Sequence, residues 1–259
     1  MAKLPVTLTI CIAFLNLSSA NKFGARIRGG DEAKIEDYPY QVALWYNGQW
    51  GKCGGSIISP NWILTAAHCV FLNRNKPELM QVLGNSAKFD SKSGVLVSVK
   101  QIICHDKWDP ERSLDYDIAL LELSEPIKCP NCKPIQLDTE GPKANEKAVI
   151  TGWGLVNETT IAQVLQGATV LVIEQTICQE WLSLLPGMLT ERMFCAGYPD
   201  GGMGTCSGDS GGPVAVNGKL SGITSWGTSS CYAKPKSPGV YSKVSAYYDW
   251  IQRYTGITF

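Results

Sequence analysis

The sequence predicts an all-β protein, an antiparallel barrel or sandwich with one C-terminal α-helix. Short apolar runs rich in Val, Ile and Tyr recur along the chain, separated by Gly, Pro, Asn and Ser. No strand-like run alternates with a long amphipathic helix, which disfavours a parallel α/β sheet. Helical spacing occurs near the end, at Val244, Tyr247 or Tyr248, Ile251 and Tyr254.

The strand-like runs are QVALWY (41–46), SIISPNWILTAA (56–67), VLVSVKQII (95–103), DIALLEL (117–123), KAVITGW (147–153), TVLVI (169–173) and GITSW (222–226). No repeat or Pro-rich linker separates them, so the two halves of the series are expected to pack closely. With 44% hydrophobic and 18% charged residues, the chain can bury a large core. Its formal net charge of zero gives no reason to expect nucleic acid or a membrane surface as a partner.

The first twenty residues are typical of a secretory signal peptide. Lys3 precedes an apolar run from Leu4 to Leu17, and Ser18 and Ala20 are the small residues of a cleavage site. The run is too short and too interrupted for a membrane span, which needs about 20 apolar residues. We therefore expect a secreted, extracellular protein whose cysteines form disulfides.

The segment Gly208-Asp209-Ser210-Gly211-Gly212 places a serine among glycines, which allows a tight turn and close approach of a carbonyl group. A serine nucleophile needs a histidine base. There are only two histidines: His68 follows an apolar run and precedes a cysteine, whereas His105 lies in a polar stretch typical of a surface loop. His68 is therefore the candidate base.

The order of these residues excludes a rival interpretation. The nucleophile elbow of α/β hydrolases also has a G-x-S-x-G pattern, but there the histidine follows the serine, and no histidine follows Ser210. The carboxylate that orients the base is expected between His68 and Ser210. Asp117, at the start of DIALLEL, is the first candidate, and Asp115, in a more polar setting, is the second.

The motifs TAAHC, DIAL and GDSGGP, in this order, resemble those of the trypsin and chymotrypsin-like serine proteases. The resemblance runs from Ile27 to the C-terminal helix and includes CGGSII, TGWG, MFCAGY, SWG and PGVY. It implies two packed six-stranded antiparallel β-barrels in one protease domain, residues 27–259, with the site between them. It also implies that His68 is the base, that Asp117 orients it, and that Ser210 attacks the peptide carbonyl. The N–H groups of Gly208 and Ser210 would then form the oxyanion hole.

The resemblance also implies activation by cleavage after Arg26, so that residues 21–26 are a propeptide. The new amino group of Ile27 would pair with Asp209. One departure is Arg28, where the family usually has Val or Ile; it offers a second basic cleavage site that would remove Ile27. The expected partners are protein or peptide substrates, an activating protease that cuts after Arg26, and protein inhibitors.

The family pattern pairs Cys53 with Cys69, Cys178 with Cys195, and Cys206 with Cys231. Cys104, Cys129 and Cys132 match no familiar pair. We favour one extra bridge within this trio, for example from Cys104 to one cysteine of the CPNC segment, with the third cysteine free or linked to another chain. A lone C-x-x-C is weak support for a metal or redox site. No cofactor and no metal is expected, because the segment after QVLG lacks the glutamates of the calcium loop in some relatives.

Asn157 heads an N-glycosylation sequon, Asn-Glu-Thr. The insertion FLNRNKPELMQ (71–81), beside His68, is a candidate for restricting substrates.

Gly204 stands where the resemblance implies the base of the primary specificity pocket, six residues before Ser210. Trypsin-like members have an aspartate there, which pairs with Lys or Arg of the substrate. Without it, a buried basic side chain would be unpaired at a cost of several kcal/mol. The other pocket residues implied are Thr205, Ser225, Trp226, Gly227 and Gly239. Gly227 and Gly239 leave a deep slot, which favours large apolar residues at P1, the substrate residue whose carbonyl is attacked.

Elastase-like or broad specificity, a narrow cascade protease, and a catalytically silent secreted binding homologue remain alternatives. A silent homologue usually lacks a residue of the triad, whereas this chain retains all three.

Overall fold

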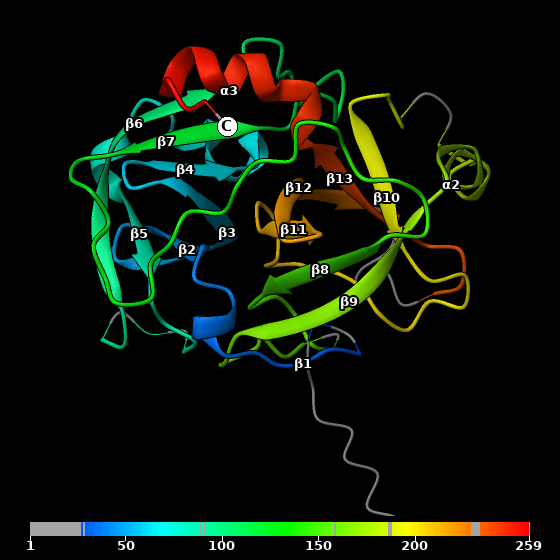
Figure 1. Cartoon of the computed structure of the whole chain (residues 1–259), viewed down its shortest axis with the longest axis horizontal. Coiled ribbons are helices and arrows are strands. Elements are labelled where there is room, and N and C mark those ends of the chain that lie inside the picture. The colour runs from blue at the N-terminus through cyan, green and yellow to red at the C-terminus, as the bar shows by residue number, and fades with distance from the viewer. Residues whose placement is uncertain are drawn as a thin grey trace, which may run out of the picture.

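The computed structural model folds into two antiparallel β-barrels that lie side by side, with a helix across the top of the first (Figure 1). The structure describes residues 27, 29–88, 90, 92–157, 159–185, 188–228 and 234–258. The expected signal peptide, Arg26, Arg28 and Cys231 lie outside the described residues. The expectation of an all-β fold with two six-stranded barrels and a C-terminal helix is confirmed.

The first barrel closes in the order β2-β3-β4-β7-β6-β5. Its strands are β2 (Gln41–Tyr46), β3 (Gln49–Ser59), β4 (Trp62–Thr65), β5 (Met80–Gly84), β6 (Val95–Cys104) and β7 (Ala119–Leu123). The second follows the order β9-β10-β13-β12-β11-β8, is closed by the pairing of β8 with β9, and carries β1 (Asp31–Glu32) on its β9 edge. Its strands are β8 (Lys147–Gly152), β9 (Gln166–Ile173), β10 (Met193–Gly197), β11 (Pro213–Val216), β12 (Lys219–Gly227) and β13 (Gly239–Lys243).

The C-terminal helix forms where its spacing indicated. A 3₁₀ turn, η4 (Val244–Tyr247), leads into α3 (Tyr248–Thr255), which ends at Gly256 in the left-handed conformation that favours glycine (φ 68°). Val244, Tyr247 and Ile251 are buried as expected, while Tyr254 is exposed.

Two short α-helices were not expected: α1 (Ala67–Val70) and α2 (Gln175–Trp181). Three further 3₁₀ turns are η1 (Ile35–Asp37), η2 (Phe71–Asn73) and η3 (Pro77–Leu79). Elements of one or two turns are too short to show helical periodicity. Both α-helices contain a disulfide-bonded cysteine, so tertiary constraints hold them in place.

Alternation along β7 shows how the barrels are joined. Leu121 packs into the core of the first barrel, whereas Leu120 packs into a second cluster with residues of β11, β12 and α3. Because that cluster includes side chains from both barrels, it holds them as one unit. This packing fixes the start of β7, and with it the residues just before the strand, against the second barrel.

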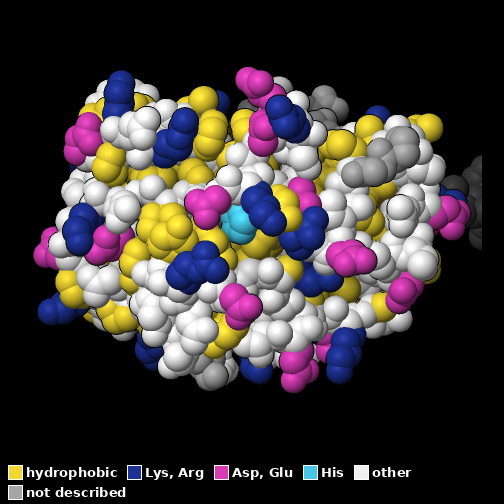
Figure 2. All heavy atoms as spheres, turned by 90° about the horizontal axis from the view of Figure 1, so that it is seen from above, with side chains coloured by type: hydrophobic (Ala, Val, Ile, Leu, Met, Phe, Trp, Pro, Cys, Tyr) yellow, Lys and Arg dark blue, Asp and Glu magenta, His cyan; other side chains and the backbone are white. Residues whose placement is uncertain are grey.

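The face that carries α3 has basic and acidic side chains interspersed with apolar ones (Figure 2). Among the described residues, no helix is long and apolar enough to cross a membrane.

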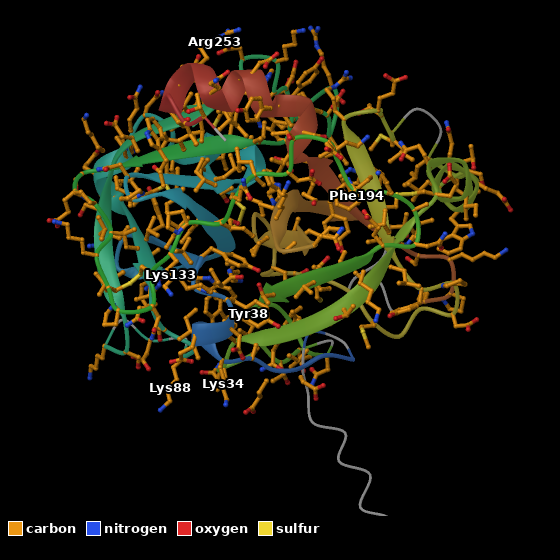
Figure 3. All side chains as sticks on the ribbon, viewed as in Figure 1. Lys34, Tyr38, Lys88, Lys133, Phe194 and Arg253 are labelled. Carbon is orange, nitrogen blue, oxygen red and sulfur yellow. A yellow bond between two sulfur atoms is a disulfide. The ribbon has the colours of Figure 1, made fainter. Side chains whose placement is uncertain are left out.

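The interior of the second barrel is filled by aromatic and branched side chains. Phe194 on β10, marked in Figure 3, lies 5.4 Å from the Tyr241 ring of β13, in the cluster that also contains Ile27.

Candidate active site

His68 lies in α1, the single helical turn that follows β4. The two alanines before it, Ala66 and Ala67, are fully buried, and a disulfide from Cys69 to Cys53 ties the turn to β3. Its backbone is therefore held from two sides, while its side chain is one-third exposed (33%). A general base requires such a position, fixed but accessible.

Asp117 lies two residues before β7 and holds His68 with both carboxylate oxygens. Oδ2 is 2.7 Å from His68 Nδ1, and Oδ1 accepts the backbone N–H of His68 at 2.8 Å. The Ser225 hydroxyl donates to Oδ2 at 2.5 Å, and the Asp117 side chain is only 2% exposed. With the proton on Nδ1 directed at Asp117, Nε2 is the nitrogen free to accept a proton.

The pKa of His68 is raised above its ordinary value. Burial alone lowers it, but the charge of Asp117 and its hydrogen bond favour the imidazolium and outweigh that effect. Asp117 thus makes the imidazole a better proton acceptor.

Ser210 lies in the turn before β11, where the two barrels meet. Its carbonyl accepts the N–H of Gly54 of β3 at 2.8 Å, and the next residue, Gly211, donates to the carbonyl of Thr224 of β12 at 2.8 Å. The serine is thus attached to the strand that the Cys53 disulfide links to α1. Within the described residues no hydrogen bond joins Ser210 Oγ to His68, whose Nε2 has Cys69 Sγ at 3.7 Å. Such bonds commonly tighten when substrate binds.

The backbone around Ser210 exposes two N–H groups. Gly208 has φ 103°, and a side chain there would collide with Gly154 and Trp50. Its N–H and that of Ser210 have no acceptor within the described part of the chain, whereas the N–H of Asp209 between them bonds to the Cys206 carbonyl at 2.9 Å. Two unengaged N–H groups flanking an engaged one can bind an oxyanion.

Asp209 points away from Ser210 into the protein interior. Its carboxylate accepts the N–H groups of Gly154 and Cys206, each at 2.8 Å, and it has no cationic partner among the residues described. Burial raises the pKa of Asp209 to about 6, against the opposing effect of these two N–H bonds. Side chains at Gly152 or Gly154 would overlap the carboxylate, which explains both glycines of TGWG.

The candidate pocket residues lie on β12, on β13 and in the segment before Ser210. Gly227 and Gly239 are paired directly across the two strands. Gly204 and Thr205 are buried, and Thr205 Oγ1 lies 3.3 Å from the Tyr241 hydroxyl. A side chain at Gly239 would overlap the Tyr241 ring.

Comparisons with known proteins agree with this geometry. The family model described as "Trypsin" matches residues 27–251. The chain belongs to the trypsin family. It is 40% identical to a trypsin of Simulium vittatum, covering 90% of this chain and 95% of that one, and 35% identical to human kallikrein-15, covering 95% and 97%. The solved structure of mouse neuropsin, a serine protease, superposes with a TM-score of 0.78 at 35% identity, covering 86% and 97%. The protein is a serine endopeptidase.

The structure distinguishes the two acid candidates of this protease. Asp117 bonds to His68, whereas Asp115 bonds to Arg192 of the second barrel. His105 lies in a loop as expected, directly after β6, but it is half-buried and its ring stacks on Tyr116 at 4.8 Å, which the sequence did not predict. An aromatic environment built from distant segments leaves no local signal in the sequence.

Bridges join Cys53 to Cys69 and Cys178 to Cys195, the pairs that the resemblance implied. The extra bridge expected within the remaining trio is present, but it joins Cys129 to Cys132 rather than involving Cys104, which is free. The CPNC segment forms a tight turn in which the Cys132 N–H donates to the Cys129 carbonyl, and this turn brings its two cysteines close together. Burial raises the pKa of Cys104 to about 11. The pair Cys206–Cys231 includes a residue outside the described part and stays a prediction.

Sequence reasoning missed two contacts at the site. Ser225 was expected only as a pocket residue, but its hydroxyl also bonds to Asp117, and Ser242 Oγ donates to the Asp117 carbonyl at 2.8 Å. Both serines come from the second barrel, over one hundred residues along the chain. Only the pairing of β12 with β13 beside the start of β7 could reveal them.

Two other features that the sequence singled out, the insertion 71–81 and Asn157, lie on the surface. The insertion 71–81 forms η2 and η3, with its last two residues in β5, and Leu72 at its tip is 89% exposed. Asn157 is exposed, and its Oδ1 accepts N–H groups of Thr159 and Thr160 at 3.0 and 2.9 Å. Both positions are accessible to a partner or a modifying enzyme.

Proposed function

We propose that this protease hydrolyses peptide bonds through an acyl-enzyme on Ser210. His68 takes the hydroxyl proton and later returns it to the leaving amine, and Asp117 orients and stabilises the imidazolium. The N–H groups of Gly208 and Ser210 bind the developing oxyanion. The bonds from Asp117 to His68 and the two unengaged N–H groups support these roles.

We further propose chymotrypsin-like specificity, with a large apolar residue at P1. The observation that carries this proposal is the absence of an acidic side chain at position 204, where the resemblance implies the base of the pocket. Gly204 has no carboxylate, and Gly239 cannot acquire a side chain without displacing Tyr241. The residues 229–233, which lie outside the described part, contain no acid either. Relatives named trypsin therefore give the family of this chain but not its P1 preference.

Substitution in the pocket tests this specificity. The wild-type protease is expected to cleave a peptide library after Phe, Tyr, Leu or Met. Gly204→Asp should raise kcat/KM for Arg relative to Phe at P1 by at least about tenfold, because the new carboxylate pairs with the guanidinium. Gly204→Asn adds similar bulk without charge and is the matched control. Wild-type cleavage mainly after Lys or Arg would overturn the proposal, and cleavage mainly after Ala or Val would favour the elastase-like alternative.

The chain is proposed to be secreted as a zymogen, with residues 1–20 as signal peptide and 21–26 as propeptide. Asp209 supports this proposal, because it is buried, has no cationic partner in the described part of the chain, and has a raised pKa. Cleavage after Arg26 by a protease specific for basic residues would give Ile27 a charged amino group that could pair with it. N-terminal sequencing of the activated protein should begin at Ile27. Activity appearing with an intact Arg26–Ile27 bond would contradict the proposal.

A further inference from the structure

An ion pair that crosses between the barrels lies next to the segment carrying Asp117. Arg192, directly before β10, donates from Nε to Asp115 Oδ1 at 3.1 Å and Oδ2 at 3.0 Å, and from Nη2 to Oδ2 at 2.5 Å. Thr190 adds its hydroxyl to Oδ1 at 3.1 Å. The Asp115 side chain is only 8% exposed, and forked pairs of this kind fix direction as well as distance.

Arg192 is itself anchored in the second barrel. Its carbonyl accepts the N–H of Lys243 of β13 at 2.8 Å, and its own N–H donates to Thr190 Oγ1 at 3.3 Å. The guanidinium therefore approaches Asp115 from a fixed part of the barrel that also carries Ser210.

Tyr116, between the two aspartates, has an unfavourable backbone conformation. Its φ of 59° lies in the left-handed region, which costs a residue with a bulky side chain about 1 kcal/mol or more. Three contacts oppose that cost. Its N–H donates to Asp115 Oδ1 at 2.9 Å, and its ring lies between the His105 ring at 4.8 Å and the Arg192 guanidinium at 4.6 Å. Arg192 thus acts on Tyr116 twice, through Asp115 and through the ring.

The direction of Asp117 depends on Tyr116. The Tyr116 carbonyl accepts the N–H of Ile118 at 2.8 Å, which closes a tight turn centred on Asp117. If Tyr116 relaxed to an ordinary conformation, this carbonyl would rotate away and the Asp117 carboxylate would turn from His68.

We propose that Arg192 and Asp115 are positioning residues for peptide hydrolysis: their ion pair holds Tyr116 in its strained conformation and so fixes the Asp117 carboxylate against His68. This rests on the role proposed above for Asp117. The ion pair thereby fixes the position of the first barrel, which carries the base and its acid, relative to the second barrel, which carries the nucleophile.

The test compares Arg192→Ala and Arg192→Lys with Arg112→Ala in the activated protease. Arg112 is the matched control because it pairs with Asp109 in the same loop, at 3.3 Å, with 86% of its side chain exposed. Arg192→Ala should lower kcat about tenfold or more with KM within about twofold, because the loss lies in the geometry of the chemical step. Arg192→Lys retains the charge but not the fork and should recover part of kcat, while Arg112→Ala should match wild type.

A second measurement separates positioning from a simple charge effect. Removing a nearby cation by itself favours the imidazolium and would raise the pKa of His68. Loosening Asp117 has the opposite effect, so the acid limb of the kcat/KM profile should move to lower pH in Arg192→Ala. Rates are normalised to active sites by titration, and melting temperatures identify variants that lose stability alone.

Several outcomes would overturn the proposal: unchanged kcat with reduced stability, a rise in KM alone, or an acid limb that moves to higher pH. Should Arg192→Ala fail to fold, Arg192→Lys must show the kcat loss or the proposal is wrong. Ser210→Ala distinguishes the underlying mechanism, because activity surviving that change contradicts the triad itself, whatever Arg192 does.

Discussion

Asp117 and Asp209 are both buried carboxylates of the candidate active site, yet their surroundings differ. Asp117, at the mouth of the first barrel, contacts an imidazole, a backbone N–H and a serine hydroxyl. Asp209 accepts two backbone N–H groups and no cation among the residues that the structure describes, and burial raises its pKa to about 6. The uncut fold therefore supplies Asp117 with its partners, whereas the described residues supply no positive charge to Asp209.

The largest expected effect on activity comes from substituting Asp117, the carboxylate that already has its partners. Asp117→Asn should lower kcat about 10⁴-fold, because the amide can stabilise neither the Nδ1–H tautomer nor the imidazolium. It removes both effects that raise the pKa of His68, so the histidine should titrate at lower pH. Steady-state kinetics and the proton resonances of His68 check these two results. Asp115→Asn should retain Asp117 and lose much less activity; equal losses in the two variants would contradict the assignment of Asp117.

The second prediction uses Asp209 to test activation. In the protease cut after Arg26, Asp209→Asn should lower kcat/KM about 10²- to 10³-fold, because the oxyanion hole loses the buried ion pair that orders it. Chromogenic peptide assays after limited cleavage measure this loss. Wild-type activity in cut Asp209→Asn would contradict the role of Ile27.

In the uncut chain, the contribution of Asp209 to the free energy of unfolding should increase as the pH falls, which is the opposite of the dependence expected after cleavage. A carboxyl whose pKa rises from 3.8 unfolded to about 6 folded binds protons more tightly when folded. The contribution of Asp209 to stability is therefore lowest above about pH 6, and it increases by up to about 3 kcal/mol as pH falls towards 4. Urea unfolding of wild type and Asp209→Asn isolates this contribution as a difference. After cleavage the pairing with Ile27 should reverse the sign of the slope, and an unchanged sign would argue against that pairing.

The comparison also shows what the sequence could and could not predict. His68, Asp117 and Ser210 follow from chain order and a count of two histidines, because the chemistry demands these residue types. The β2 and β6 strands follow from local apolar patterns. Ser225 on Asp117, His105 on Tyr116 and the bridge from Cys129 to Cys132 did not, because each depends on which distant segments meet or on local turn geometry.

The smallest effect should come from the hydroxyl that the second barrel contributes to Asp117. Ser225→Ala removes the donor at Oδ2 but leaves both bonds between Asp117 and His68, so kcat should fall about tenfold or less. Ser225→Thr, which keeps the hydroxyl, is the matched control, and stopped-flow acylation rates measure both. A loss as large as that of Asp117→Asn would mean that the two bonds between Asp117 and His68 do not hold the carboxylate in place without this hydroxyl. Asp117 would then depend on one further partner, as Asp209 is proposed to depend on Ile27, and the two regions would differ less than their contacts indicate.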